Sequence, residues 1–287
     1  MKRICTYIRD CLAAVLLLGS VSCTERVDIE LDSTYRRLIV EAEVTTDSVH
    51  HWVILTTSGD YFVNEPAMGV SGGMVELSFE NQILALTEID SLPGTYETPF
   101  AFRGMPGTTY YLDISQVDID QDGQYENYHA TSTMPSGAEL HSIELRYFET
   151  PIVSGYVVQM YANHPPDQPD WFGFKIRNNG RLLTDTLIKY NVFSDELFDD
   201  GYLPGLPVGF LSDDDPLQAA HPGDTITFEL NCIELFYYEF ITAAHQEIIG
   251  NNPLFSGPPA NIKSNISNGA RGAFAAFSVQ RTSTIVP

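Results

Sequence analysis

The stretch LIVEAEV, residues 38–44, points to the fold class, because it is rich in the β-branched and apolar residues that favour strands. Five similar runs follow, separated by Gly, Pro, Asn and Asp. They are WVILTTS (52–58), MVELSF (74–79), ILALTEI (83–89), TYYLDIS (109–115) and NYHATSTM (127–134). Six short strands at this spacing predict a β-sandwich.

Turn residues inside this region indicate the kind of sandwich. Pro93-Gly94-Thr95-Tyr96 and the segment Gly104–Tyr110 read as two strands joined by a turn rich in Gly and Pro. Small immunoglobulin-like and transthyretin-like modules share this feature. We therefore expect an immunoglobulin-like β-sandwich over residues 23–135, ending near Pro135.

The remainder, residues 136–287, predicts a second β-rich domain. Its expected strands are IELRYF (143–148), YVVQMYA (156–162), DTITFELNC (224–232) and GAFAAFSVQR (272–281). In WFGFKIRNNGRLLTDTLI (171–188), Asn178-Asn179-Gly180 between apolar runs is a strong hairpin signal. The stretch between residues 191 and 224 shows little periodicity, and we expect a long irregular loop there that is functional or partly mobile.

One amphipathic helix is expected near the C-terminus, over about residues 234–249. Its apolar residues recur at helical spacing, and Gly250 with Asn251 provides a stop signal. The expected apolar stripe consists of Ile233, Phe236, Tyr237, Phe240, Ala244 and Ile248. We expect this stripe to be buried against a sheet rather than to form a ligand box.

The N-terminus carries the pattern of a cleaved lipoprotein signal over residues 1–22. A basic start precedes an apolar core, Leu12 to Leu18, that is much shorter than the roughly 20 residues of a spanning helix. Small residues and then Cys23 follow, so we expect Cys23 to be acylated and to anchor the protein to a membrane. An ordinary secretory signal with a coincidental cysteine is the alternative.

Cysteine usage and charge limit the function classes further. Of the four cysteines, Cys5 and Cys11 lie in the signal and Cys23 would carry lipid, which leaves Cys232 without a disulfide partner. Cys232 lies in phase with the apolar residues of its strand, so we expect a buried small hydrophobe. The chain has 38 acidic and 15 basic residues, and this excess of negative charge argues against nucleic-acid binding.

The C-terminal segment NPLFSGPPANIKSNISNGARGAFAAFSV, residues 252–279, resembles the closing motif of a family of Bacteroidetes lipoproteins, domain-of-unknown-function family 4249. The segment 38–42 and the turns at 93–96 and 106–110 agree with that family. The resemblance implies an exported lipoprotein, of a kind often encoded beside TonB-dependent outer-membrane receptors. It implies no catalytic residues.

The run VDIDQDGQYENYH places Asp118, Asp120 and Asp122 at alternate positions, with Gly123 next and Glu126 three residues further on. Alternating carboxylates before a glycine are typical of calcium loops. His129 stands where an EF-hand needs a bidentate glutamate, which excludes an EF-hand. A shorter calcium loop at a hairpin tip and a solvated acidic turn both remain open.

The family resemblance, together with the lipoprotein signal, implies a non-enzymatic protein of the outer membrane that acts as an accessory or binding subunit of a TonB-dependent nutrient uptake system. Glu25 and Asp28 after the lipidated cysteine favour the cell surface over the periplasmic face. The alternative is a structural or adhesive envelope protein without a small ligand. A third hypothesis is a hydrolase with a site in the 190–223 loop, although the chain shows no His-Glu-x-x-His motif.

An aromatic pocket would favour ligand capture over protein contact. The aromatic residues proposed for such a pocket are Trp171, Tyr202, Phe210 and Tyr237.

Overall fold

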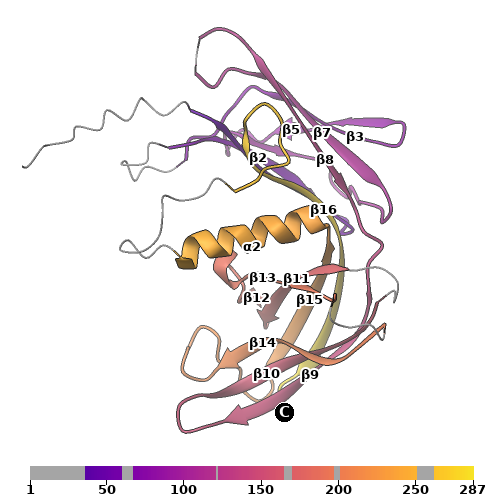
Figure 1. The fold of residues 1–287 in the computed structure, drawn as a ribbon, viewed down its shortest axis with the longest axis vertical. Helices are drawn as coiled ribbons and strands as arrows, with labels where there is room; N and C mark the ends of the chain where they lie inside the picture. Colours follow the sequence, from indigo (N-terminus) through magenta and orange to yellow (C-terminus); the bar gives the residue numbers. More distant parts are fainter. Residues whose placement is uncertain (1–35, 60–66, 121, 165–169, 197–200, 251–261) are drawn as a thin grey trace, which may run out of the picture. The chain divides into compact units, whose positions relative to one another are not determined.

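The structure is a computed structural model that describes residues 36–59, 67–120, 122–164, 170–196, 201–250 and 262–287. These residues are mainly β-strand, and their one α-helix lies near the C-terminus (Figure 1). The predicted fold class, a mainly β protein with one helix near the C-terminus, is therefore confirmed.

Among the described residues, eight strands precede residue 135. They are β1 (Leu38–Thr45), β2 (Trp52–Thr57), β3 (Met74–Phe79), β4 (Gln82–Ala85), β5 (Thr87–Glu88), β6 (Thr95–Glu97), β7 (Thr109–Val117) and β8 (Glu126–Thr133). The predicted runs at 38–44, 52–58, 74–79, 109–115 and 127–134 each correspond to one strand, and the run at 83–89 divides into β4 and β5.

The remaining strands are β9 (Glu139–Glu149), β10 (Ser154–Asn163), β11 (Trp171–Asn178), β12 (Arg181–Leu182), β13 (Asn191–Ser194), β14 (Tyr202–Ser212), β15 (Thr225–Ile233) and β16 (Arg271–Ile285). The helix α2 spans Leu235–Gly250, and the short 3₁₀ helix η1 spans Leu187–Lys189.

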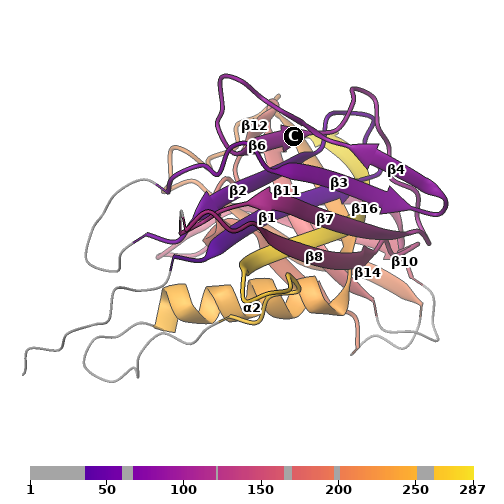
Figure 2. The same cartoon turned by 90° about the horizontal axis from the view of Figure 1, so that it is seen from above.

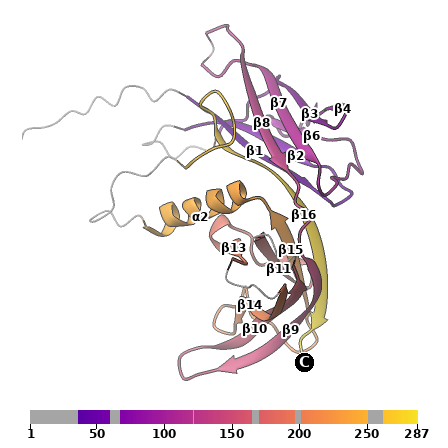
Figure 3. The same ribbon diagram turned by 45° about the vertical axis from the view of Figure 1, so that its right-hand side comes forward.

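A nine-stranded sheet connects the two halves of the chain. Its order is β12-β11-β15-β16-β1-β2-β6-β5, with β13 paired to β11. The long strand β16 lies between β15 and β1, antiparallel to the former and parallel to the latter. Figures 1 and 3 show it as one continuous yellow strand that runs from the upper to the lower part of the molecule. The last strand of the sequence is therefore central to the largest sheet.

The first core lies between one end of the large sheet and the four-stranded sheet β4-β3-β7-β8. Alternate residues of β1 are buried there: Leu38, Val40, Ala42 and Val44. From the far end of the sequence, β16 adds Phe274 and Ala276. The core of the N-terminal half is therefore completed by C-terminal residues, and Figure 2 shows the yellow β16 running among the purple strands of this half.

The second core lies between β11 and β15 of the large sheet and the three-stranded sheet β14-β10-β9. Both faces of β15 are largely buried, and its in-phase residues Ile226, Phe228, Leu230 and Cys232 point into this core. Gly137 contacts Cys232 so closely that a Cβ there would lie 2.3 Å from Sγ. The expectation that Cys232 is a buried hydrophobe is confirmed, and burial raises the pKa of its thiol to about 11.

The opposite face of the large sheet packs against α2. Ala275 and Phe277 of β16, with Ile233 at the end of β15, form this third cluster with Tyr237 and Tyr238 of the helix. The helix prediction of 234–249 is confirmed within one residue. Its expected stripe is buried at Ile233 and Ala244, whereas Ile248 in the last turn is 53% exposed.

The hairpin prediction at Asn178-Asn179-Gly180 is confirmed. Asn178 pairs with Arg181, and the two loop residues Asn179 and Gly180 have φ values of 49° and 83°. Positive φ at both positions is what a two-residue type I′ hairpin requires, and Asn-Gly tolerates it best.

The prediction of an irregular loop over 191–224 is wrong in part, since β13 and β14 lie within it. Strand β14 pairs with β10 over its whole length, with two register shifts. It carries Pro204 and Pro207, which lack a backbone N–H, and it lies at the edge of its sheet, where this lack is tolerated. The prolines, and the extra residue at each bulge, interrupt the alternation of buried and exposed residues by which a strand is recognised in a sequence.

The predicted boundary near Pro135 stays a prediction. Residues 36–287 form one compact unit, in which β16 contributes Phe274 and Ala276 to the first core and Ala275 and Phe277 to the third cluster.

Gly272 is expected to be essential for the parallel pairing of β1 and β16. It faces Val40 in the register, its φ is +100°, and a Cβ there would lie 2.0 Å from the Val40 carbonyl oxygen. The substitution Gly272→Ala is therefore expected to lower the free energy of unfolding by about 2–4 kcal/mol, measured by urea denaturation. Gly59→Ala, where a Cβ meets nothing within 4 Å, is the control and is expected to stay within about 0.5 kcal/mol of the wild type. Equal stability of both variants would contradict this account of the strand pairing.

Candidate functional site

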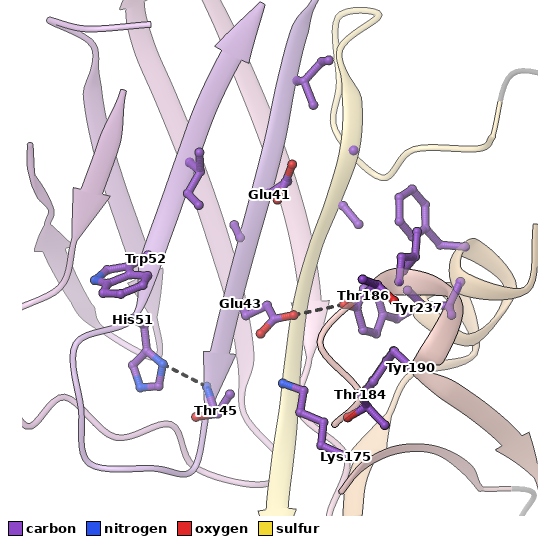
Figure 4. A pocket seen from close by; sticks show the side chains of 18 of the residues that line it. Glu41, Glu43, Thr45, His51, Trp52, Lys175, Thr184, Thr186, Tyr190 and Tyr237 are labelled. Carbon is purple, nitrogen blue, oxygen red and sulfur yellow. Dashed lines mark hydrogen bonds between the residues drawn. The ribbon is translucent and has the colours of Figure 1, made fainter. Parts of the chain in front are cut away.

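A cleft of about 930 Å³ opens on the α2 side of the large sheet. Strands β1, β2 and β16 form its floor, α2 forms one wall, and the segment 184–190 around η1 forms another. His245 of α2 hydrogen-bonds the carbonyl of Leu187 at 2.8 Å, which ties the two walls together. Figure 4 shows side chains from all of these elements around one space.

Two glutamates of β1 lie on the floor of the cleft. Alternation along the strand buries Val40, Ala42 and Val44 in the first core, so Glu41 and Glu43 project to the other face, and both are exposed. Side chains at i and i+2 of a strand lie about 6.6 Å apart along it. The two carboxylates are therefore neighbours on one surface.

Tyr237 of α2 forms the aromatic wall beside them. Its ring stacks on Phe277 of β16, with 6.2 Å between centroids and 10° between planes, and on Phe240 at 6.3 Å and 6°. Its hydroxyl donates a hydrogen bond to Glu43 at 3.1 Å (Figure 4). Burial, and then the nearby Glu43 carboxylate, raise the pKa of Tyr237 well above its ordinary value, so the hydroxyl stays protonated.

Tyr190 is the second aromatic residue that the fold fixes at the cleft. Its ring covers Gly173 of β11, where any Cβ would lie 1.9 Å from the tyrosine hydroxyl. The hydroxyl accepts a hydrogen bond from the Asn231 side chain at 3.2 Å. Lys175 lies between two rings, with Nζ 5.7 Å from the centroid of Tyr190 and 5.8 Å from that of Phe277. Its position is stabilised by cation–π attraction.

A cluster of ion pairs continues this surface beyond the cleft. Glu229 of β15 has only 3% of its side chain exposed and lies near three cations: Lys175 at 3.8 Å, Arg177 at 3.9 Å and Arg281 at 2.8 Å. Arg281 also forms a bidentate pair with Asp47, at 2.8 and 2.6 Å. The Arg281 hydrogen bond, more than any other interaction, holds the pKa of Asp47 below its ordinary range. The buried charge of Glu229 is thus compensated.

The rim beside β2 contains His51 and Trp52. The His51 ring is buried; its Nδ1 accepts a hydrogen bond from the Thr45 amide and its Nε2 donates to the Phe102 carbonyl. Burial lowers the pKa of His51, which favours the neutral ring. Trp52 is 53% exposed, an unusual position for so large an apolar side chain. Because it lines the cleft, Trp52 offers a stacking surface to a ligand.

The predicted calcium ligands are brought together in part. One carboxylate oxygen from each of Asp118, Asp120 and Asp122 lies within 4.8 Å of the others, and among the described residues this is the one such group. Glu126 lies outside it and accepts a hydrogen bond from the Tyr128 hydroxyl at 3.3 Å. Asp118 Oδ1 is buried without a hydrogen-bond partner in the described part of the chain.

The same loop also has the contacts of an acidic turn. Asp118 Oδ2 accepts from the Gly123 amide at 3.0 Å, and Asp122 Oδ1 accepts from the Gln124 amide at 2.7 Å. Such bonds form in Asx turns with or without an ion. Calcium binding therefore stays a prediction.

Of the other candidate residues, Cys23 lies outside the described residues. Tyr237 lines the cleft, whereas Trp171 packs in the third cluster and Tyr202 and Phe210 lie on β14. Asp213 Oδ2 accepts hydrogen bonds from the Tyr147 and Ser154 hydroxyls, and Asp215 Oδ1 accepts one from the Leu217 amide of its own turn.

Glu41, Glu43 and Trp52 line the cleft, and none of them was predicted from the sequence as a site residue. A signal was present, since two charged residues alternate with buried apolar ones in β1. That pattern is also normal for a solvated sheet face, so only the position of α2 distinguishes a cleft floor from an ordinary surface.

With the fold and cleft defined, comparison with known families assigns the chain. The model of the family described as a domain of unknown function, DUF4249, matches residues 24–283. The chain belongs to this family. No curated protein matches it. Within the described residues, no helix has both the length and the apolar character needed to span a membrane.

The calcium hypothesis predicts stabilisation by the ion. Extracellular modules with weak sites bind calcium at about 10⁻⁴–10⁻³ M, so about 10 mM calcium is expected to stabilise the fold by about 1–3 kcal/mol. The unfolding temperature should rise by a few degrees in differential scanning calorimetry. Asp118→Asn should abolish the rise, whereas Asp214→Asn in an exposed turn should keep it. An unchanged wild-type transition would identify the loop as a solvated acidic turn.

The Asp47–Arg281 pair predicts a pH-dependent contribution to stability. The pKa of Asp47 is lowered from 3.8 in the folded protein, so its stabilisation is fully present above that value and is lost as pH falls through the folded pKa. Urea denaturation should show Asp47→Asn to be less stable than the wild type at about pH 7, with a smaller difference at about pH 3. Asp90→Asn, in an exposed turn, is expected to match the wild type. A difference for Asp47→Asn that does not change with pH would exclude the ion pair as its source.

Proposed function

We propose that this DUF4249 protein is an outer-membrane lipoprotein, anchored through Cys23, that acts as an accessory or binding subunit of a TonB-dependent nutrient uptake system. The observation that carries the binding role is the cleft between β1, β2, β16 and α2. The proposed transport partner follows from the family resemblance described above.

The dimensions and lining of the cleft support ligand capture. Small-molecule sites commonly occupy about 300–1,000 Å³ and combine apolar walls with a few fixed polar groups. This cleft has about 930 Å³, stacked aromatic rings at Tyr237 and Phe240, and carboxylates at Glu41 and Glu43. The side chains that hold Tyr237 and Tyr190 in place are part of the packed sheet, so little ordering is needed when a ligand binds.

The proposed anchor agrees with the charge and sequence of the N-terminal segment. Several acyl chains on Cys23 would provide stable membrane attachment, because each buried methylene adds to the affinity. Glu25 and Asp28 follow directly, and we propose the cell surface as the location. The cleft would then be available to a ligand before transfer to the receptor.

A structural or adhesive envelope module is the second candidate. The observation that favours it is a group of exposed apolar side chains near one rim of the cleft: Val49 at 43%, Trp52 at 53% and Phe100 at 73% exposure. Exposed apolar groups of this kind mark protein contacts. The concave lining beside them supports ligand capture as the first function.

Affinity purification of the lipidated protein from its native membrane tests the proposal. Mild detergent, an affinity tag at the C-terminus and mass spectrometry are expected to recover a TonB-dependent receptor in near-equal amount. The variant Cys23→Ala is expected to incorporate no labelled palmitate and to recover much less receptor. Recovery of the lipidated protein alone, from membranes that contain intact receptors, would reject the accessory role and leave the envelope module.

A further inference from the structure

We propose that the cleft binds a cationic ligand, a guanidinium or ammonium group carried by a molecule of short-peptide size, between Glu41, Glu43 and Trp52. This inference rests on the proposed binding function and names the ligand class. It is carried by the strand register around the glutamates, by the absence of ion-pair partners for them among the described residues, and by the exposed aromatic surface.

The register leaves both carboxylates uncovered on one side. In the parallel pairing of β1 with β16, Glu41 lies opposite Ala273 and Glu43 lies opposite Ala275. Alanine has no side-chain atoms beyond Cβ, so the residues of β16 that lie directly opposite the glutamates do not cover them. On the other side, Glu41 lies opposite Ile54 of β2. The two carboxylates thus lie in a trough with apolar edges.

The cations near the trough have other partners or lie apart from the glutamates. Lys175 is near Glu229 at 3.8 Å and two aromatic rings, and Lys189 pairs with Asp185 at 2.9 Å. His50 lies 3.5 Å from Glu97. Arg271 lines the cleft opposite Ile39, but no ion pair within 4 Å joins Arg271 or any other described residue to Glu41 or Glu43.

Glu229 has the neighbouring cations that Glu41 and Glu43 lack among the described residues. There the fold surrounds one buried carboxylate with three cations, as a buried charge requires. At Glu41 and Glu43 it places two like charges on one face of a strand, and among the described side chains a single neutral donor, the Tyr237 hydroxyl, hydrogen-bonds one of them. A bound cation would relieve this repulsion and could hydrogen-bond both carboxylates.

The aromatic lining fits the same ligand class. Trp52 is exposed at the cleft, and a cation is attracted to the face of an indole ring more strongly than to that of other aromatic side chains. The net charge of the chain, −23, adds a long-range attraction for cations and repels anions. An anionic ligand would meet Glu41 and Glu43 directly, which excludes it from this part of the cleft.

Binding of defined probes to the full lipidated protein in detergent micelles tests the inference. The probes are tri-L-arginine, tri-L-lysine, tri-L-glutamate and maltotriose, followed by isothermal titration calorimetry and by tryptophan fluorescence. We expect the two basic peptides to bind, with affinity that falls as salt concentration rises, and the acidic peptide and the neutral sugar to bind at least tenfold more weakly.

Variants locate the binding in the trough. Glu41→Gln/Glu43→Gln is expected to weaken tri-arginine binding at least tenfold. Glu139→Gln/Glu149→Gln, which removes two exposed carboxylates from β9, makes the same change in net charge and is expected to stay within twofold of the wild type. Trp52→Ala is expected to weaken binding severalfold and to abolish the fluorescence change. Because all these side chains are exposed, thermal unfolding should be similar in every variant.

Three results would overturn the inference: maltotriose or tri-glutamate binding as tightly as tri-arginine, full binding by the Glu41→Gln/Glu43→Gln variant, or absence of tri-arginine binding to the wild type. Its failure is distinguishable from failure of the proposed function. Tight maltotriose binding, or co-purification of the receptor without peptide binding, would retain the binding subunit and reject the cationic ligand. If the basic peptides bind but no receptor is recovered, the cationic ligand is retained and the role in TonB-dependent uptake is rejected.

Discussion

The parallel pairing of β1 with β16 is the constraint on which the rest of the structure depends. It joins the first strand of the described chain to the last, and it needs Gly272, since no side chain fits against Val40 at that point. Through this pairing Phe274 completes the first core and Phe277 supports Tyr237 of α2. The two sandwiches and the cleft therefore share one strand, and the cleft floor exists only when that strand is in register.

The parts of the fold that could be predicted depend on interactions between residues close in the sequence, and the parts that could not depend on interactions between distant residues. Strand propensity, the Asn179-Gly180 turn and the helical apolar spacing are local, and they correctly indicated most strands, one hairpin and α2. Strand β14 was missed because Pro204 and Pro207 are compatible with an edge strand only when β10 is available to pair with it. The cleft was missed because the β16 residues beside Glu41 lie more than 200 positions away in the sequence, and no local pattern encodes that register.

Acidic residues on the α2 face of the large sheet differ in whether cations surround them. Glu229 is buried and surrounded by cations, which makes it part of the structure, and Asp47 joins the same cluster through Arg281. Glu41 and Glu43 remain exposed, with a neutral hydroxyl as their one contributor of a hydrogen bond among the described side chains. Glutamate therefore stabilises the fold at position 229, whereas at positions 41 and 43 its negative charge is available to attract a cation from solution. The ligand class is assigned from this difference in ion pairing between Glu229 and the two cleft glutamates, and not from the large number of acidic residues in the chain.

The central position of β16 also determines the order in which the fold can be assembled. Every contact that β1 makes with β16 closes a loop of more than 200 residues, so the first core cannot be completed until the C-terminal end of the chain is available. During synthesis from the N-terminus, β1 and β15 present unpaired edges up to that moment, and unpaired edges promote aggregation. A chain cut short before residue 271 would keep both edges permanently, so for the cell an incomplete copy of this protein is a hazard and not a smaller functional module.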